Sequence, residues 1–243
     1  MSETPKRLAG RLALVTGASR GIGAAVARRF AQEGAELILV ARTVGGLEET
    51  DDAVRQAGSR ATLVPLDLAD FPAIDRLGQA IYDRHGRLDI LVGNAAQLGL
   101  LQPIQQIRPE EWQQVIDLNL TANWRLIRSM HPLLQQSPSG RAIFVSSGVS
   151  TTPRAYWGTY AVSKAALDMV AGIYAAETRR GTIRVNILDP GIVRTRMRAR
   201  AFPGEDPMKL RAPAEITDAF VDLASAECQR HGERIDLSVP VTA

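Results

Sequence analysis

The chain has 243 residues, of which 45% are hydrophobic and 23% are charged, and this ordinary globular composition excludes a disordered chain, a collagen and a coiled coil. The net charge of +3 is too small to indicate a nucleic-acid partner. The single cysteine excludes an internal disulfide, and the three histidines are scattered, so no cluster typical of a metal site is present in the sequence.

The N-terminal segment and the longest uncharged run bear on where the protein is located. We expect residues 1–10 to form a polar lead-in, because they lack the apolar core of a secretory signal. The uncharged run at residues 90–107 contains Asn94, Gln97 and Pro103, which are costly in hydrocarbon, so it does not predict a membrane span. Together with the lone cysteine, these features predict a cytoplasmic protein with no membrane partner.

Short apolar runs alternate with amphipathic stretches along the rest of the chain. The runs predict strands at residues 12–15, 37–40, 63–66, 90–92, 143–145, 183–188 and 235–237. Helical spacing predicts helices at residues 22–30, 47–57, 70–85, 109–134, 160–180 and 214–226. Repeated βαβ units indicate an α/β fold, with one doubly wound domain over residues 11–243 and a parallel sheet of about seven strands covered on both faces. Ligands bind such sheets beyond the carboxyl ends of the strands.

A glycine-rich turn follows the first predicted strand and opens the first predicted helix. Its spacing is Gly17-x3-Gly21-x-Gly23, with Ser19, Arg20 and Ile22 between the glycines. Residues without Cβ let the backbone bend and a pyrophosphate approach, and free amides at the helix start attract negative charge. Three glycines alone are also compatible with an ordinary tight turn, but their position between strand and helix favours a dinucleotide site.

The second predicted strand ends at Ala41 and Arg42, where a site for NAD normally carries an acidic residue. Two guanidinium groups, from Arg20 and Arg42, suit a 2′-phosphate and therefore favour NADP(H) over NAD(H). The alternative is that both are solvated surface arginines. Asp67 either accepts a hydrogen bond from the adenine amine or caps the helix that starts near Asp70.

Tyr160 and Lys164 lie four residues apart on a predicted helix and so share one face. A phenol has a pKa of about 10, and we expect the ammonium to lower it, so that the pair can move a proton to or from a carbonyl oxygen. The chain has only three lysines among 29 cationic residues. That scarcity favours a specific role for Lys164 over a solvated Tyr–Lys pair.

Ser147 and Asn119 complete the candidate catalytic set. Ser147 follows the fifth predicted strand, and its hydroxyl can hold a substrate carbonyl in line with Tyr160, although Ser146 is a competing candidate. Asn119 interrupts the apolar face of the predicted helix 109–134. A buried amide needs partners, so we expect Asn119 to loosen this helix and to hold a water near Lys164.

These segments resemble the short-chain dehydrogenase/reductase family over residues 10–237, in particular bacterial oxidoreductases of the YciK type. The matching motifs are TGASRGIG, Asn94-Ala95, Asn119, Ser147, Tyr160-Ala-Val-Ser-Lys164 and Pro190-Gly191 followed by Thr195. The resemblance implies a Rossmann-type sheet, catalysis by Ser147, Tyr160 and Lys164 assisted by Asn119, and a homodimer or homotetramer built through long helices. The implied cofactor-binding residues are Gly17, Ser19, Arg20, Gly21, Ile22, Gly23, Arg42, Asp67, Leu68, Asn94, Tyr160, Lys164, Pro190, Gly191, Val193 and Thr195.

The chain departs from the family pattern in two places. After the fourth predicted strand it has Gly93-Asn94-Ala95-Ala96 where the family usually has Asn-Asn-Ala-Gly. Gly93 removes a side-chain hydrogen bond, and Ala96 adds a methyl group beside the expected nicotinamide ribose, so cofactor affinity is the property in question. The chain also ends soon after Leu237, without the glycine-rich finish common in the family.

The sequence thus predicts an NADP(H)-dependent oxidoreductase that transfers hydride between nicotinamide and a carbonyl or secondary alcohol, with Tyr160 as general acid and base. The alternative is a non-enzymatic NADP(H)-binding sensor or scaffold. Residues 194–211 mix apolar side chains with arginines. They form either a mobile loop and helix with solvated arginines or a wall for an apolar substrate with an acidic handle. Nucleic-acid binding by this cluster has little support, since no aromatic residues are interleaved among its first arginines.

Overall fold

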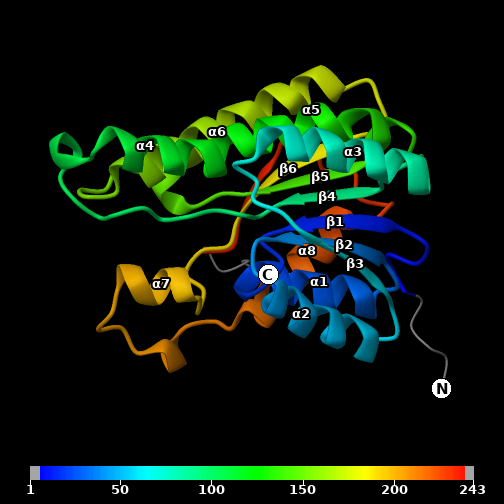
Figure 1. Cartoon of the computed structure of the whole chain (residues 1–243), viewed down its shortest axis with the longest axis horizontal. Helices are drawn as coiled ribbons and strands as arrows, with labels where there is room; N and C mark the ends of the chain where they lie inside the picture. The colour runs from blue at the N-terminus through cyan, green and yellow to red at the C-terminus, as the bar shows by residue number, and fades with distance from the viewer. Residues whose placement is uncertain (1–5, 239–243) are drawn as a thin grey trace.

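A seven-stranded parallel sheet organises the computed structural model, which describes residues 6–238 (Figure 1). The strands are β1 (Leu12–Thr16), β2 (Glu36–Ala41), β3 (Ala61–Pro65), β4 (Ile90–Gly93), β5 (Arg141–Val145), β6 (Arg184–Asp189) and β7 (Arg234–Asp236). Their order in the sheet is β3-β2-β1-β4-β5-β6-β7. The inner strands are short, mainly aliphatic runs that are buried on both faces, which is why they lack polar alternation.

The order of the strands determines where a ligand can bind. β1 pairs with β2 on one side, with Leu12 opposite Glu36, and with β4 on the other, with Ala13 opposite Ile90. The chain therefore leaves β1 in one direction along the sheet and returns past it to β4. A crevice forms at such a reversal, beyond the carboxyl ends of these two strands.

Helices cover both faces of the sheet (Figure 1). The described residues form α1 (Gly21–Gln32), α2 (Val44–Gln56), α3 (Phe71–His85), α4 (Pro109–Ile116), α5 (Ala122–Gln135), α6 (Gly158–Thr178), α7 (Arg196–Ala201) and α8 (Thr217–Ala224). Helices α1, α2 and α8 lie on one face, where Phe30 and Phe220 are fully buried. Helices α3, α5 and α6 lie on the other, with Ile74, Met130 and Leu167 in the core. The predicted α/β class with helices on both faces is confirmed.

The helix predicted over residues 109–134 is interrupted, although its span is right. Between α4 and α5 the backbone widens into a π-helical segment, Asp117–Thr121, centred on Asn119. The helix is irregular at Asn119, as predicted, and the Asn119 side chain bonds a neighbouring loop. The last predicted helix is shorter than expected, since residues Pro213–Ile216 form a 3₁₀ turn before α8.

A helix within residues 194–211 was one of the expected alternatives, whereas the short 3₁₀ turns were not predicted. Helix α7 is six residues long and is capped by the Thr195 hydroxyl, which accepts a hydrogen bond from the Arg198 amide at 3.1 Å. Three further 3₁₀ turns lie at Ile104–Gln106, Gly148–Ser150 and Pro207–Lys209. Each is too short for hydrophobic periodicity to indicate it.

The termini of the predicted domain need one correction. Leu8, within the expected lead-in, is fully buried in the core with the residues of α1, and its amide donates to the Glu33 carbonyl at 2.9 Å. Packing therefore begins before residue 11. Residues 1–5 of the lead-in and residues 239–243 of the predicted domain lie outside the described residues. Among the helices that are described, none is long and apolar enough to cross a membrane.

Candidate active site

A cleft of about 800 Å³ opens at the carboxyl ends of β1 to β5. Its floor is formed by the residues that follow these strands, and its far wall by residues between 194 and 214. The predicted site residues that line it are Gly17, Ser19, Arg20, Gly21, Ile22, Arg42, Asp67, Leu68, Asn94, Lys164 and Thr195. Residues that follow five of the seven strands therefore line the same cleft.

The glycine turn between β1 and α1 has no room for side chains at two positions. Gly17 has a φ of +65°, and a Cβ there would lie 2.8 Å from the Asn94 amide nitrogen. A Cβ at Gly23 would lie 2.3 Å from the Gly17 carbonyl oxygen, so Gly23 shapes the turn from behind rather than lining the cleft. No side chain caps the start of α1. Its first amides are therefore available to an anion.

Thr16 joins the glycine turn to the end of β4, a role that sequence reasoning missed. Its hydroxyl accepts hydrogen bonds from the amides of Asn94 (2.9 Å) and Ala95 (3.0 Å) and donates to the Val92 carbonyl at 3.1 Å. The Asn94 side-chain amide donates to the Thr16 carbonyl at 2.8 Å. These bonds fix the two loops at the point where the strand order reverses.

Gly93 is explained by its surroundings. A Cβ at this position would lie 2.5 Å from the Asn123 side-chain oxygen and 2.7 Å from the Phe144 ring. The asparagine usual in the family would therefore require both neighbours to move. Ala96, the second departure, lines the cleft.

One end of the cleft is cationic. Arg42 follows β2 and its guanidinium lies 3.6 Å from the Asp67 carboxylate, with both side chains largely in solvent. Arg20, also exposed, lines the same end. The alternative that Asp67 caps α3 is wrong, because that cap is Asp70, whose carboxylate accepts from the Ala73 amide at 3.2 Å.

Lys164 of α6 lines the other end of the cleft, and the buried Tyr160 lies next to it on the same helix. Tyr160 and Lys164 lie one turn apart on the same face, with the Lys164 ammonium 5.9 Å from the centre of the Tyr160 ring. Both side chains are buried. Lys164 donates a hydrogen bond of 2.7 Å to the Val145 carbonyl at the end of β5. The strand end therefore fixes the position of the ammonium.

Burial changes the acidity of both groups. It raises the pKa of Tyr160 to about 12, against the smaller opposing effect of the Ser147 hydroxyl. The prediction of a lowered phenol pKa is therefore wrong, because desolvation of the phenolate and the nearby Asp189 carboxylate both raise it. Burial also lowers the pKa of Lys164 to about 8, although Asp168 and Asp189 act to raise it. At neutral pH the pair is thus a neutral phenol beside a mostly protonated amine.

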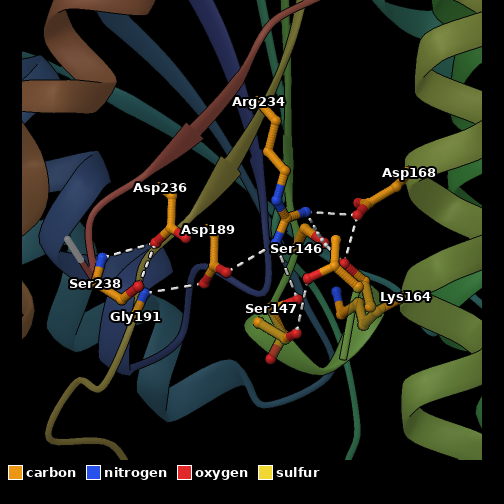
Figure 2. Close-up of polar contacts among 12 residues, drawn as sticks. Ser146, Ser147, Lys164, Asp168, Asp189, Gly191, Arg234, Asp236 and Ser238 are labelled. Atoms are coloured by element: carbon orange, nitrogen blue, oxygen red, sulfur yellow. Dashed lines mark hydrogen bonds and ion pairs between the residues drawn. The ribbon is translucent and has the colours of Figure 1, made fainter. Parts of the chain in front are cut away.

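The structure distinguishes Ser147 from Ser146. Ser147 is the residue whose hydroxyl acts on the Tyr160 phenol, and it has an extended backbone at the start of the Gly148–Ser150 turn. Ser146 is buried and its hydroxyl instead lies 3.4 Å from that of Ser150 and 3.2 Å from an Arg234 nitrogen (Figure 2). Ser147 is therefore the serine that faces the tyrosine.

Asn119 is fully buried and acts on the loop after β4. Its side-chain oxygen accepts from the Gln97 amide at 2.8 Å, and its nitrogen donates to the Gln97 carbonyl at 2.9 Å. The same nitrogen lies 3.0 Å from the hydroxyl of Ser163, the residue before Lys164. The amide thus connects this loop to α6, and the predicted water near Lys164 stays a prediction.

Some predicted residues lie behind the cleft rather than on its wall. Pro190, Gly191 and Val193 do not line it, nor do Tyr160 and Ser147. The Gly191 amide donates to the Asp189 carboxylate at 3.0 Å, and Val193 is buried and pairs with Arg211 in a short bridge. These residues position the segment that carries Thr195.

Aromatic and cationic side chains surround the approach to Tyr160. The Trp157 ring lies edge-on to the Tyr160 ring, 6.0 Å between centres, and 5.9 Å from the Phe202 ring. The Arg154 guanidinium lies 5.3 Å from the Trp157 ring and 5.0 Å from the Phe202 ring. Arg198 also contacts Phe202, but it is paired with Glu205 at 2.5 Å. A positively charged, aromatic surface therefore lies next to the phenol.

Residues 11–206 match the short chain dehydrogenase family. The chain belongs to this family. It is similar to the uncharacterized oxidoreductase YciK of Escherichia coli (strain K12), with 37% identity over 223 residues, which cover 90% of this chain and 88% of that protein.

Two solved structures are also similar to this short chain dehydrogenase. One is a short chain dehydrogenase from Shigella flexneri 2a strain 301 in complex with NADP, with 36% identity, a TM-score of 0.92, and coverage of 96% of this chain and 99% of that one. The other is a short chain dehydrogenase from Escherichia coli CFT073 in complex with NADPH, again with 36% identity and a TM-score of 0.92, covering 96% and 98%. The chain is thus an oxidoreductase of this family.

Proposed function

We propose that this short chain dehydrogenase uses NADPH to reduce a carbonyl compound and, in reverse, oxidises a secondary alcohol. The observation that carries the proposal is the cleft itself, because it runs from a cationic end at Arg20 and Arg42 to Lys164, whose ammonium lies 5.9 Å from the centre of the buried Tyr160 ring. A dinucleotide is long enough to reach both. The NADP and NADPH complexes of the two related structures support the same cofactor.

The residues present fit a phosphorylated dinucleotide. The turn at Gly17 admits no Cβ, so backbone amides are the groups that meet the pyrophosphate. Within residues 6–238, Arg42 pairs with one carboxylate, that of Asp67 at 3.6 Å, and both side chains are exposed, so its guanidinium is available to a 2′-phosphate. Asn94 and Thr195 are the polar residues we assign to the nicotinamide end.

Bound NADPH supplies the hydride, and the protein supplies the proton and the orientation. The Ser147 hydroxyl donates a hydrogen bond to the substrate carbonyl oxygen and holds it beside the Tyr160 phenol. A phenol with a pKa of about 12 is neutral at pH 7, which is the form that gives a proton to the developing alkoxide. The Lys164 ammonium, held by the Val145 carbonyl, stabilises the phenolate that results.

The decisive experiment follows NADPH and NADH oxidation against a chemically diverse panel of carbonyl compounds. Tyr160→Phe should lower kcat by about 10²- to 10⁴-fold, the usual contribution of general acid catalysis, while NADPH affinity stays unchanged. The matched control is Tyr174→Phe, because Tyr174 is also buried on α6 but bonds to His131 at 3.0 Å, away from the cleft. That variant should keep the wild-type rate.

Two results would contradict the proposal. A wild-type kcat in the Tyr160→Phe variant would show that Tyr160 is not the proton donor. Tight NADPH binding without turnover on any member of the panel would instead favour a cofactor sensor or scaffold.

The substrate class we propose is an apolar carbonyl compound with an acidic handle. Support comes from Arg154, which lies over two aromatic rings beside Tyr160 and makes no ion pair among the described residues. A carboxylate or phosphate on the substrate would form an ion pair with the Arg154 guanidinium. Anionic ketones, including 3-oxoacyl thioesters of an acidic carrier, should be reduced faster than neutral ketones of the same size, and equal rates would exclude the handle.

We also propose that the protein assembles as a homodimer or homotetramer through its long helices. Helix α6 carries Val162, Met169 and Ile173 at helical spacing, each at least two-fifths exposed. Trp124 on α5 is exposed as well. An apolar stripe of this kind is typical of a protein interface.

A further inference from the structure

Arg234 of β7 reaches from the last strand to the end of the sheet that holds the catalytic residues (Figure 2). Its guanidinium donates to Asp168 on α6 at 2.5 Å and to Asp189 on β6 at 2.8 Å. It also donates to the backbone carbonyl of Ser147 at 3.1 Å and to the Ser146 hydroxyl at 3.2 Å. One side chain therefore joins three elements that meet at the active site.

The side chains that make these contacts are largely buried. The Asp189 side chain is only 2% exposed, and those of Asp168 and Arg234 are 17% and 24% exposed. Burial raises the pKa of Asp189, and Arg234 acts to lower it. The other titratable groups that share this field are Lys164, Tyr160 and Asp236. Loss of the guanidinium would leave two carboxylates uncompensated.

Each contact of Arg234 leads to a residue of the proposed mechanism. Asp168 lies one helical turn after Lys164, so holding Asp168 fixes that turn of α6 relative to the sheet. The Ser147 carbonyl belongs to the same residue whose hydroxyl faces Tyr160. Asp189 also accepts from the Gly191 amide at 3.0 Å, which anchors the segment leading to Thr195.

We propose that Arg234 is a positioning residue, which holds Ser147 and the Lys164 turn of α6 in the register that proton transfer requires. The proposal rests on the proposed function, because it concerns the same reaction. A planar guanidinium is needed, since one nitrogen bonds to Asp168 while the other bonds to Asp189 and Ser147. An ammonium of lysine is a single point charge and cannot reproduce this fork.

The test compares Arg234→Lys with Arg234→Met in the full-length protein. In Arg234→Lys the charge remains but the fork is lost, so kcat for reduction should fall about tenfold or more, as expected for misplaced reacting groups. In Arg234→Met, kcat for reduction should fall further than in Arg234→Lys. NADPH affinity, measured by nicotinamide fluorescence, should stay within about twofold in both variants, since Arg234 does not line the cofactor cleft.

A pH profile separates positioning from charge. In Arg234→Met the uncompensated Asp168 and Asp189 should raise the pKa of Lys164, so the alkaline limb of kcat should move up by about half a pH unit or more. Arg234→Lys keeps a cation at the site, and its limb should stay at the wild-type pH. A purely structural role would lower stability without this split between the two variants.

Arg141→Met is the control for stability. Arg141 is buried on β5 and bonds to the carbonyls of Ser225 (2.9 Å) and Ala226 (2.7 Å), at the end of the sheet away from the cleft. This variant should lower the melting temperature, while the folded fraction keeps the wild-type kcat. Because Arg234→Lys retains the charge, it keeps the test valid if Arg234→Met does not fold.

The outcomes that overturn the inference differ from those that overturn the proposed function. Wild-type kcat in folded Arg234→Lys would show that the fork positions nothing, even with Tyr160→Phe inactive. A loss of kcat in Arg234→Lys that disappears at another pH would equally overturn it, because a changed protonation state rather than lost positioning would then explain the loss. If Tyr160→Phe itself retained full activity, the proposed function would fail first, whatever Arg234 does.

Discussion

Burial shifts the pKa values of Tyr160 and Lys164 in opposite directions and disfavours the charged form of both. It raises the pKa of the phenol to about 12 and lowers that of the amine to about 8, and both shifts favour the neutral group. The environment of the two residues therefore disfavours ionised side chains. The protonated form of Lys164 is stabilised by specific contacts, such as its hydrogen bond to the Val145 carbonyl. A small change in the electrostatic field at Tyr160 and Lys164 therefore changes which protonation states they adopt.

The lowered pKa of Lys164 predicts a stability that depends on pH. Between pH 8 and 10.5 the unfolded chain binds the proton that the folded chain has released, so this group makes the free energy of unfolding rise with pH. At 1.36 kcal/mol per pKa unit, the difference between wild type and Lys164→Met should shift by about 2 kcal/mol in favour of wild type from pH 7 to pH 10. Urea denaturation measures it, and a pH-independent difference would contradict the lowered pKa.

The Arg42 side chain leads to a prediction about the preference for NADPH over NADH. In Arg42→Asp the carboxylate replaces a cation beside Asp67, so kcat/KM with NADPH should fall about 10- to 100-fold, the usual loss for a hydrogen bond to a charged group. NADH turnover should be retained or rise. Arg84→Asp, at the exposed last turn of α3 and outside the cleft, is the control and should leave the NADPH-to-NADH ratio unchanged.

Elements of secondary structure matter here chiefly where they are irregular. The π-helical segment Asp117–Thr121 lets the Asn119 side chain leave its own helix and bond both backbone groups of Gln97. The irregular turn thus connects α4 and α5 to the loop that carries Asn94.

Replacing Asn119 should therefore loosen that loop. Asn119→Ala leaves the half-buried backbone amide and carbonyl of Gln97 without their partners, and the free energy of unfolding should drop by about 2–4 kcal/mol. Hydrogen exchange at the Gln97 amide should rise, and kcat should fall. Gln113→Ala on α4, whose side chain is exposed and bonds Asp117, is the control and should change neither.

The element order was predictable because each strand is a short apolar run and each helix an amphipathic stretch. The sixth strand was predicted at 183–188 and spans Arg184–Asp189, while the seventh, predicted at 235–237, spans Arg234–Asp236. That small shift of β7 hid Arg234, which read as a flanking residue. Its partners on β6 and α6 lie 45 and 66 positions away, so no local pattern could indicate them.

At the scale of the whole molecule, the exposed apolar stripe on α6 predicts the assembly. Met169 is 66% exposed and Ile173 50% exposed, and a Cβ at Gly172 between them would meet open space. Met169→Glu should place a charge in the proposed interface and shift the protein toward monomers in light scattering. Tyr82→Glu, which changes an exposed aromatic residue on α3, is the control. A Met169→Glu protein of unchanged mass would exclude this stripe as the interface.

The amino-acid sequence by itself determined the alternation of strands and helices, the glycine turn and the spacing of Tyr160 and Lys164, because all of these depend on neighbours within a few residues. The tertiary structure decided which of Ser146 and Ser147 faces the phenol, whether Asp67 or Asp70 caps α3, and the direction of the Tyr160 pKa. It also decided that Arg234 meets Ser147, Asp168 and Asp189. Burial and long-range contact exist only once the sheet has formed, and these features depend on both.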